Sequence, residues 1–462
     1  GAVVTGIFDY WRQGTAGSPA RRRILDAGTV RLADTDDGTY ATTIASSLTS
    51  GAVPSYFTFD DLLISCNDAQ GASDVPRSWD QTTAQNLAGT PPKFAFGCAH
   101  KNRAWAAGAV AQPSRLYYSA NIDPEDWTGA GSGSIDIDPQ DGDGLTGMVS
   151  HKDNLFVFKG PNKGSIHQIT GSAPTGSDGF ARKPFASGIG ACWHNAIFRF
   201  GNDIGFVSQY GSVHSLSATA AYGDFLQAAL SRPINRWIND HLNRNRLRFI
   251  SAATDHFNGF VLITMSIDAN STNNCCIAMD YRGAPDVIRW SRIPAYSMGS
   301  LGAFVDTSGV RRILGGGNDG YVRRLNVADR SIDGATALSF RAKTPSMSYG
   351  NPFMMKTISV ASLGIVPKGD FDMTFGWTRD NNAQQTYTQD QGGGTPLDTF
   401  TLDSSTLGVL AGSLAIDRFM ELNDGDEFRS ISYDVRQNAV NQDIELHSIS
   451  AVITPNAIST EN

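Results

Sequence analysis

The sequence has 462 residues, which is too many for one ordinary hydrophobic core, so two or more domains are expected. With 48 glycines, 19 prolines and 18% charged residues, it is typical of a turn-rich all-β protein and excludes a disordered or mainly helical one. A net charge of −8 argues against tightly wrapped nucleic acid as a partner, and no apolar run is long enough for a membrane-spanning segment.

A block of two or three β-patterned runs, bounded by glycine, recurs along the first two thirds of the chain. The chain opens on a strand-like run, GAVVTGIFDYWRQG, so we expect further residues upstream of Gly1. Clear copies of the block cover residues 92–120, 145–171, 190–218, 247–267 and 301–327. Each alternates apolar and polar residues on either side of a polar turn, and a repeat of about 40–50 residues is typical of propeller blades. We therefore predict an irregular β-propeller of five to seven blades over residues 1–333.

One segment, residues 223–247, interrupts the strands with helical spacing. Its apolar stripe consists of Leu226, Leu230, Ile234, Trp237, Ile238 and Leu242. Pro233 is unfavourable inside a helix, so we expect a break near Ser231 and a second helix with the proline in its first turn. We predict a helical insertion whose stripe packs on the propeller; docking on a neighbouring subunit is the alternative.

After residue 334 the alternating runs become longer and lose their regular glycine boundaries. Examples are FMMKTISVASLGIV and ELHSISAVITP. This pattern predicts a second all-β unit, a C-terminal β-sandwich-like domain over residues 334–462.

The loop SIDIDPQDGDG, residues 134–144, is the strongest candidate for a metal site. It contains Asp136, Asp138, Asp141 and Asp143. Calcium loops combine clustered carboxylates with glycine turns, but here the spacing slips by one residue after Asp138. We predict a solvated loop and no bound metal, with these four aspartates as weak calcium candidates.

Catalytic and redox motifs are missing from the sequence. There is no G-x-S-x-G elbow and no phosphate-binding G-x-x-x-x-G-K-[ST], and the histidines occur singly. SANIDPEDW, residues 119–127, departs from the repeated boxes of sialidase-like propellers in the position of its Asp. We therefore predict no catalytic residue, no cofactor and no enzymatic activity. The five cysteines lack C-x-x-C spacing, which indicates reduced thiols and assembly in a reducing compartment.

The order of several segments resembles that of a known protein family. A strand SRLYYS runs into a D-P-x-x-W turn at residues 114–127, and a strand pair ending in Thr-Gly follows at residues 152–171. A strand that turns through Gly-Ser and then a short helix occupy residues 211–238. In this order, over residues 92–327, the chain resembles the tail hub or nozzle proteins of short-tailed bacteriophages, including the packaged-DNA stabilisation type.

The resemblance implies a structural virion protein that retains and then releases packaged DNA. It implies a homo-oligomeric ring, commonly a hexamer, which contacts portal and adaptor proteins and a tail fibre or needle. Duplex DNA would pass through the ring without sequence specificity. The implied location is the virion tail, with assembly in the cytoplasm of the bacterial host.

A second interpretation stays open beside this one. The chain would be a receptor- or carbohydrate-binding propeller of a tail fibre or of a lectin-like protein. In that case exposed aromatic residues such as Trp79 and Trp127 are the expected glycan contacts.

Overall fold

The structure, a computed structural model, divides the chain into two compact units, Gly1–Asn326 and Val327–Asn462. The boundary predicted from the sequence lies a few residues later, between residues 333 and 334. The residues that the structure describes are 1–13, 20–34, 38–222, 229–284, 287–306, 308–325, 331–332, 336–368, 372–380, 382–390, 416–421, 427–439 and 443–456.

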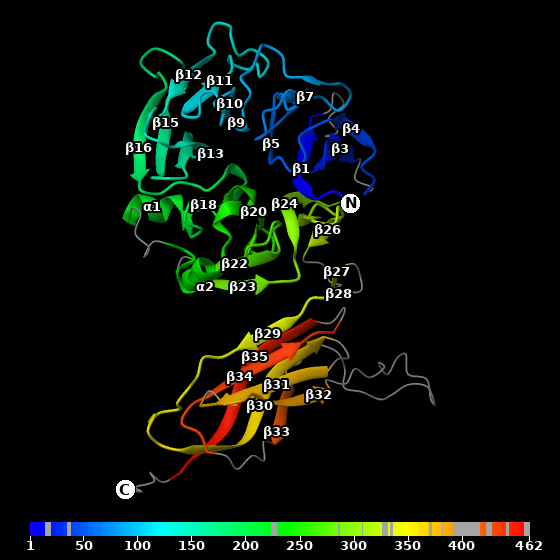
Figure 1. Ribbon diagram of the computed structural model, residues 1–462, viewed down its shortest axis with the longest axis vertical. Coiled ribbons are helices and arrows are strands. Elements are labelled where there is room, and N and C mark those ends of the chain that lie inside the picture. The colour runs from blue at the N-terminus through cyan, green and yellow to red at the C-terminus, as the bar shows by residue number, and fades with distance from the viewer. Residues whose placement is uncertain are drawn as a thin grey trace. The chain divides into compact units, whose positions relative to one another are not determined.

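The described part of the first unit forms seven small antiparallel sheets, each made of consecutive strands (Figure 1). Blade 1 contains β1 (Val4–Arg12), β2 (Ala20–Ala27), β3 (Val30–Asp34) and β4 (Thr42–Ala45). Blade 2 contains β5 (Pro54–Phe59), β6 (Leu62–Asn67), β7 (Arg77–Trp79) and β8 (Ala84–Asn86). Blade 3 contains β9 (Phe96–His100), β10 (Arg103–Ala107), β11 (Arg115–Tyr118) and β12 (Gly133–Asp136). Blade 4 contains β13 (Gly144–His151), β14 (Asn154–Gly160), β15 (Ser165–Thr170) and β16 (Ala181–Ser187).

The remaining three blades complete the circle. Blade 5 contains β17 (Ile197–Phe200), β18 (Asp203–Val207) and β19 (Val213–Ser215). Blade 6 contains β20 (Ser251–Asp255), β21 (Phe260–Met265), β22 (Cys275–Gly283) and β23 (Val287–Ile293). Blade 7 contains β24 (Met298–Val305), β25 (Arg311–Gly317) and β26 (Val322–Leu325). The predicted all-β propeller is therefore confirmed, at the upper end of the predicted number of blades.

The first strands of successive blades contact one another around the ring: β1 with β5, β5 with β9, β9 with β13, β13 with β17, β17 with β20 and β20 with β24. The ring closes because β24 in turn packs against β1. At this closure Ser300 Oγ donates a hydrogen bond to the Val4 carbonyl oxygen over 3.1 Å. Among the described strands, none of blade 7 forms a β-ladder with a strand of blade 1. The ring therefore closes through packing of the blade 7 sheet against the blade 1 sheet.

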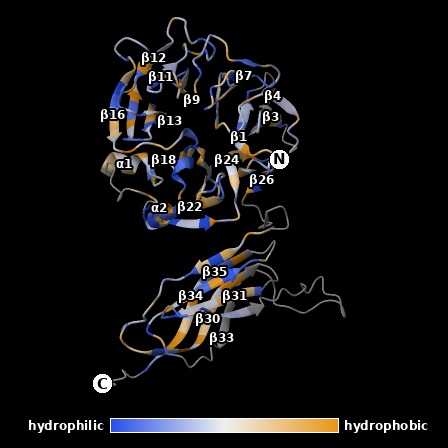
Figure 2. Cartoon of the chain, viewed as in Figure 1, coloured by the Kyte–Doolittle hydropathy of each residue, from blue (hydrophilic) through white to orange (hydrophobic). Residues whose placement is uncertain are grey.

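The strand β10 illustrates why both faces of a blade are buried. Side chains alternate across a strand, and Ala104 and Ala106 pack in a cluster with blade 2. Trp105 and Ala107 point to the other face and pack in a cluster with blade 4. Figure 2 shows hydrophobic residues on the strands of both units, whereas many connecting loops are hydrophilic. An alternation that buries apolar residues on both faces is what stacked blades require.

Short helices connect and support blades 5 and 6. They are η1 (His194–Ala196), α1 (Leu216–Tyr222), η3 (Arg232–Ile234), α2 (Asn235–His241) and η4 (Arg244–Phe249). As expected, a helical turn begins after Ser231 with Pro233 in its first turn. This turn is the short helix η3, and α2 follows it directly. Ile238 and Leu242 pack in a core cluster with blades 5 and 6, whereas Leu226 of the predicted stripe lies outside the described residues. No helix of the described residues is long and apolar enough to cross a membrane.

The second unit contains two sheets with a shared apolar core, as a sandwich requires. One sheet has the order β29 (Phe340–Lys343), β34 (Ile431–Gln437), β31 (Asp372–Arg379) and β32 (Gln385–Asp390). The other has the order β33 (Ile416–Glu421), β30 (Lys356–Lys368) and β35 (Asp443–Pro455). A two-stranded hairpin, β27 (Ser331–Ile332) and β28 (Thr336–Ala337), precedes them. Phe375 and Tyr433 stack in the core with ring centroids 5.7 Å apart.

Candidate functional site

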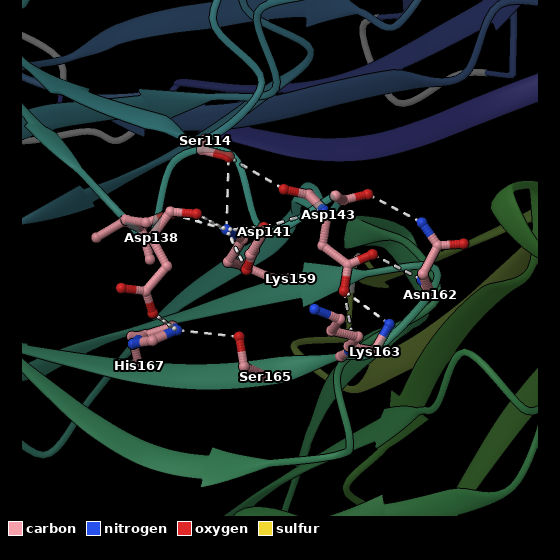
Figure 3. Close-up of polar contacts among 12 residues, drawn as sticks. Ser114, Asp138, Asp141, Asp143, Lys159, Asn162, Lys163, Ser165 and His167 are labelled. Carbon is pink, nitrogen blue, oxygen red and sulfur yellow. Dashed lines mark hydrogen bonds and ion pairs between the residues drawn. The ribbon is translucent and has the colours of Figure 1, made fainter.

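The acidic loop of residues 134–144 closes around a lysine side chain (Figure 3). Lys159 extends from β14, and its side chain is fully buried. Its Nζ donates hydrogen bonds of 2.8 Å to the carbonyl oxygens of Ile137 and Asp138 and to the Asp141 carboxylate. The ammonium therefore occupies an oxygen-lined position of the kind that a metal cation prefers.

The other three aspartates of the loop have partners elsewhere. Asp136 pairs with Arg115 at 2.7 Å, and Asp138 pairs with Arg182. The hydrogen bond from Arg182 lowers the pKa of Asp138. The Asp143 carboxylate accepts the backbone N–H groups of residues 162, 163 and 164 at 2.7 to 2.9 Å.

The structure thus places Asp136, Asp138, Asp141 and Asp143 in one loop without directing them toward one centre. Among the described residues there is no group of three or more His, Cys, Asp or Glu side chains that could hold a metal ion. Lys159 is not among the site residues predicted from the sequence. Its signal in the sequence is an isolated lysine within an otherwise apolar strand, LFVFKG.

The axis of the propeller contains three neighbouring cavities of about 230, 180 and 560 Å³. The first lies at the end where the inner strands begin, since Val3, Thr5 and Gly299 line it. The third lies where they end, and Trp11 and Val305 line it. Each of these cavities is a concave site at which several blades converge.

The first cavity combines polar groups from three loops. Arg246 comes from η4, Asn273 from the connection between β21 and β22, and Asn318 from the turn between β25 and β26. Arg246 Nε, Asn273 Oδ1 and Asn318 Oδ1 are buried without a hydrogen-bond partner. A buried polar atom without a partner is unfavourable, so a water or a ligand in the cavity is the expected hydrogen-bond partner of these three atoms.

Neighbouring contacts fix the orientation of these groups. Asn273 Nδ2 donates to the carbonyl oxygens of Phe249, at 2.7 Å, and Gly299, at 3.2 Å. Asn318 Nδ2 donates to the Asn273 carbonyl oxygen at 2.7 Å. The Arg246 guanidinium stacks over the Phe249 ring at 3.6 Å. Because both amide NH2 groups are already engaged, the two Oδ1 atoms are the acceptors that remain for a ligand.

The turn η1 divides the axial space between the first and second cavities. Asn195 lines both cavities, and its Nδ2 donates to the Pro54 carbonyl oxygen at 3.1 Å. This contact joins blade 5 to blade 2 across the axis. The neighbouring His194 stacks on Phe96 with ring centroids 5.1 Å apart, and burial lowers its pKa to about 4. The side chain is therefore neutral at neutral pH and suited to apolar packing.

The two tryptophans expected to contact a glycan are in the core. Trp79 is 2% exposed and Trp127 is 8% exposed. Trp79 packs on Tyr10, and Trp127 donates its indole N–H to the Pro124 carbonyl oxygen. The prediction that they are exposed is wrong, because each blade buries both of its faces against neighbours.

No protein-family model matches the chain, and no curated protein does either. Three solved structures with similar folds are an exo-β-1,3-galactanase from Phanerochaete chrysosporium, an arabinoxylan arabinofuranohydrolase of glycoside hydrolase family 43 from Bacillus subtilis, and SapL1 lectin in complex with α-methyl fucoside. Their identities to this chain are 7%, 10% and 12%, and the TM-scores are 0.30, 0.27 and 0.32. The matches cover 97%, 97% and 70% of this chain, and 99%, 96% and 94% of the other chains. The likeness concerns the fold alone.

These structures correct the prediction that the chain has no enzymatic activity. That prediction followed from missing catalytic motifs, yet two of the similar structures are glycoside hydrolases. An exclusion of enzymes from the sequence alone is therefore wrong. Glycoside hydrolysis needs a pair of Asp or Glu residues on either side of the scissile bond, and such a pair need not form a short motif in the sequence.

Proposed function

We propose that this chain is a carbohydrate-binding propeller, as in a receptor-binding tail protein or a lectin-like protein, and that the first axial cavity is its saccharide site. The observation that supports this most is the set of three unpartnered atoms, Arg246 Nε, Asn273 Oδ1 and Asn318 Oδ1, in residues lining one cavity. Sugar hydroxyl groups both donate and accept hydrogen bonds, so one sugar ring can satisfy the guanidinium and both amides.

The rest of the lining has the same chemistry. Ser271 and Thr272 add hydroxyl groups, and Phe249 adds an aromatic ring next to them. A volume of about 230 Å³ is below the usual range for drug-sized ligands, which suits one sugar ring or the end of a saccharide chain.

The test is saccharide binding by the full chain, first on a glycan array and then by calorimetry with the strongest binder. We expect Asn318→Ala to weaken that binding about tenfold or more, because a hydroxyl group loses its acceptor. Asn202→Ala, in an exposed turn of blade 5, is the matched control and should bind as the wild type does. Absence of any saccharide binding by the folded wild type, or equal affinity of Asn318→Ala, would contradict the proposal.

A second candidate function is a tail hub or nozzle subunit of a short-tailed bacteriophage. The order of segments over residues 92–327 favours it. The contact between Asn195 and Pro54 lies across the propeller axis, so DNA would have to pass between subunits of a ring and not through one propeller. This agrees with a conduit that six copies enclose beneath portal and adaptor proteins.

The two candidates differ in assembly. As a hub, the purified full chain should form closed rings, seen by electron microscopy and by a mass several times 49.5 kDa in light scattering. A chain that stays monomeric at high concentration and binds a saccharide would favour the first candidate. A ring without saccharide binding would favour the second.

A further inference from the structure

The third axial cavity, of about 560 Å³, differs from the first in its charge. Its lining includes Arg199 from β17, Arg311 from the start of β25 and His256 from the turn after β20. All three residues are exposed. The cavity therefore presents two guanidinium groups at one mouth of a propeller in a chain whose net charge is −8.

The carboxylate in this lining does not neutralise the two arginines. Asp9 forms a bidentate pair with Arg21, with N–O distances of 2.7 and 2.8 Å. Its Oδ2 also accepts the Val305 backbone N–H at 3.3 Å. Since Asp9 and Arg21 compensate each other, the charges of Arg199 and Arg311 remain in excess.

The two arginines keep donors available. One N–H of Arg199 reaches the Ser150 carbonyl oxygen at 2.5 Å, which anchors the side chain and leaves other N–H groups. The Arg311 side chain has no hydrogen-bond or ion-pair partner in the described part of the chain. Burial and the nearby charge of Arg311 lower the pKa of His256, so its imidazole is neutral at neutral pH and offers one ring N–H.

An aromatic surface lies beside these donors. Trp11 is 42% exposed, and the guanidinium of Arg21 lies 4.7 Å from its ring centroid. Its indole N–H donates to Asp9 at 3.3 Å, which helps to hold the ring at the edge of the cavity. An exposed tryptophan next to guanidinium groups is suited to a ring that carries a negative charge.

We propose that the third cavity binds an anionic group, a carboxylate or a phosphate, with Arg199 and Arg311 as its charged donors and Trp11 packing on the ring that carries it. This site is separate from the first cavity, at the opposite end of the inner strands. It therefore does not depend on the saccharide site proposed above.

Calorimetry with glucuronate, glucose and inorganic phosphate tests the proposal. Glucuronate and glucose differ in the carboxylate, and phosphate presents the other anion without a ring. We expect the wild type to bind glucuronate, phosphate or both more tightly than glucose, and the double variant Arg199→Ala/Arg311→Ala to bind the anion at least tenfold more weakly. Arg236→Ala, whose side chain is 97% exposed on α2, is the matched control and should retain binding.

The outcomes separate the two anions and the two sites. Binding of glucuronate alone identifies a carboxylate on a sugar ring, and binding of phosphate alone identifies a phosphate group. The proposal would be overturned if the double variant bound the anion as tightly as the wild type does. It would also be overturned if glucose and glucuronate bound equally well and phosphate did not bind. Because exposed arginines are replaced, thermal unfolding should confirm a folded variant. The double variant should leave unchanged the binding of an uncharged saccharide found for the first cavity, so the two proposals can fail separately.

Discussion

Lys159 Nζ lies 2.8 Å from the Asp141 carboxylate, and the main chain of the same loop supplies two further oxygen acceptors. The cation at the centre of this loop is thus part of the chain. Burial opposes ionisation of Asp141, but the hydrogen bonds from Lys159 and from the Asp143 backbone N–H, together with the charges of Lys159 and Lys163, lower the pKa of that carboxyl group. The composition of this acidic loop resembles that of an ion-binding loop, but here Lys159, from a strand of the next blade, binds the loop's oxygen atoms.

Replacement of this lysine should destabilise the propeller. Lys159→Met removes the ammonium and leaves the Ile137 and Asp138 carbonyl oxygens without their donor. We expect the free energy of unfolding to fall by roughly 2–4 kcal/mol, as for loss of a buried charged hydrogen-bond donor. Urea denaturation gives this value. Lys152→Met, in an exposed turn, should change it by less than about 0.5 kcal/mol, and a similar loss in both variants would contradict the role of Lys159.

Calcium should not stabilise the wild-type protein. Each carboxylate of the 134–144 loop already has a positively charged or N–H partner, so a calcium ion would have to displace those partners. We expect the same melting temperature in millimolar calcium and in chelator. A ligand that binds the folded state raises the melting temperature, so a clear rise in calcium would show that this loop or another site binds the ion.

The packing between blades 4 and 5 should depend strongly on Phe156. This residue is 7% exposed, shares a core cluster with Ile204 and Phe206 of blade 5, and forms an edge-to-face contact with Phe185 of its own blade at 5.1 Å. Truncation in Phe156→Ala leaves a cavity, and we expect a loss of about 3–5 kcal/mol in the free energy of unfolding. Phe257, which is 73% exposed, provides the control, since Phe257→Ala should have little effect. Nearly equal stabilities of the two variants would argue against the interface between these blades.

Stability should decrease between neutral and mildly acidic pH because of buried histidines. His214 is 2% exposed, and burial lowers its pKa to about 4, whereas an unfolded histidine has a pKa of about 6.5. Between these values the unfolded chain binds a proton that the folded chain does not. The stability contribution is therefore complete above about pH 6.5 and is lost as the pH falls toward about 4.

His214→Gln removes this titration. The slope of unfolding free energy against pH should become shallower by up to about 1.4 kcal/mol per pH unit within that window. Denaturation curves at several pH values measure the slope. His447→Gln is the control, since the His447 side chain is 48% exposed in the second unit. An unchanged slope in His214→Gln would mean that His214 also titrates normally in the folded protein.

Much of the fold follows from local alternation, whereas the sites depend on contacts between distant residues. Trp105 lies between alanines in β10, and this alternation predicts a strand buried on both faces. The axial cavities could not be predicted in the same way. Arg246, Asn273 and Asn318 meet because three different loops end at one mouth of the ring, and nothing in their local sequence reports that proximity.

The tryptophans show the opposite difficulty. Trp79 and Trp127 lie near polar turns in the sequence, which suggests exposure, but the neighbouring blade covers them. Groups that act together in a folded chain need not be neighbours in its sequence, so the lack of short catalytic motifs does not exclude an enzyme. A prediction from short motifs therefore describes the blades better than the space between them.

The way in which the circle closes also sets an order of events during synthesis. Val4 and Ile7 share their core with Phe304 and Leu314, so this face of blade 1 has no partner until the ribosome has released blade 7. At about 5–20 residues per second, the delay for some 300 residues is roughly 15–60 s. During that interval the first blade presents an apolar surface to other nascent chains. The junction between the two ends of the propeller is thus the last to form and the one most open to misassembly.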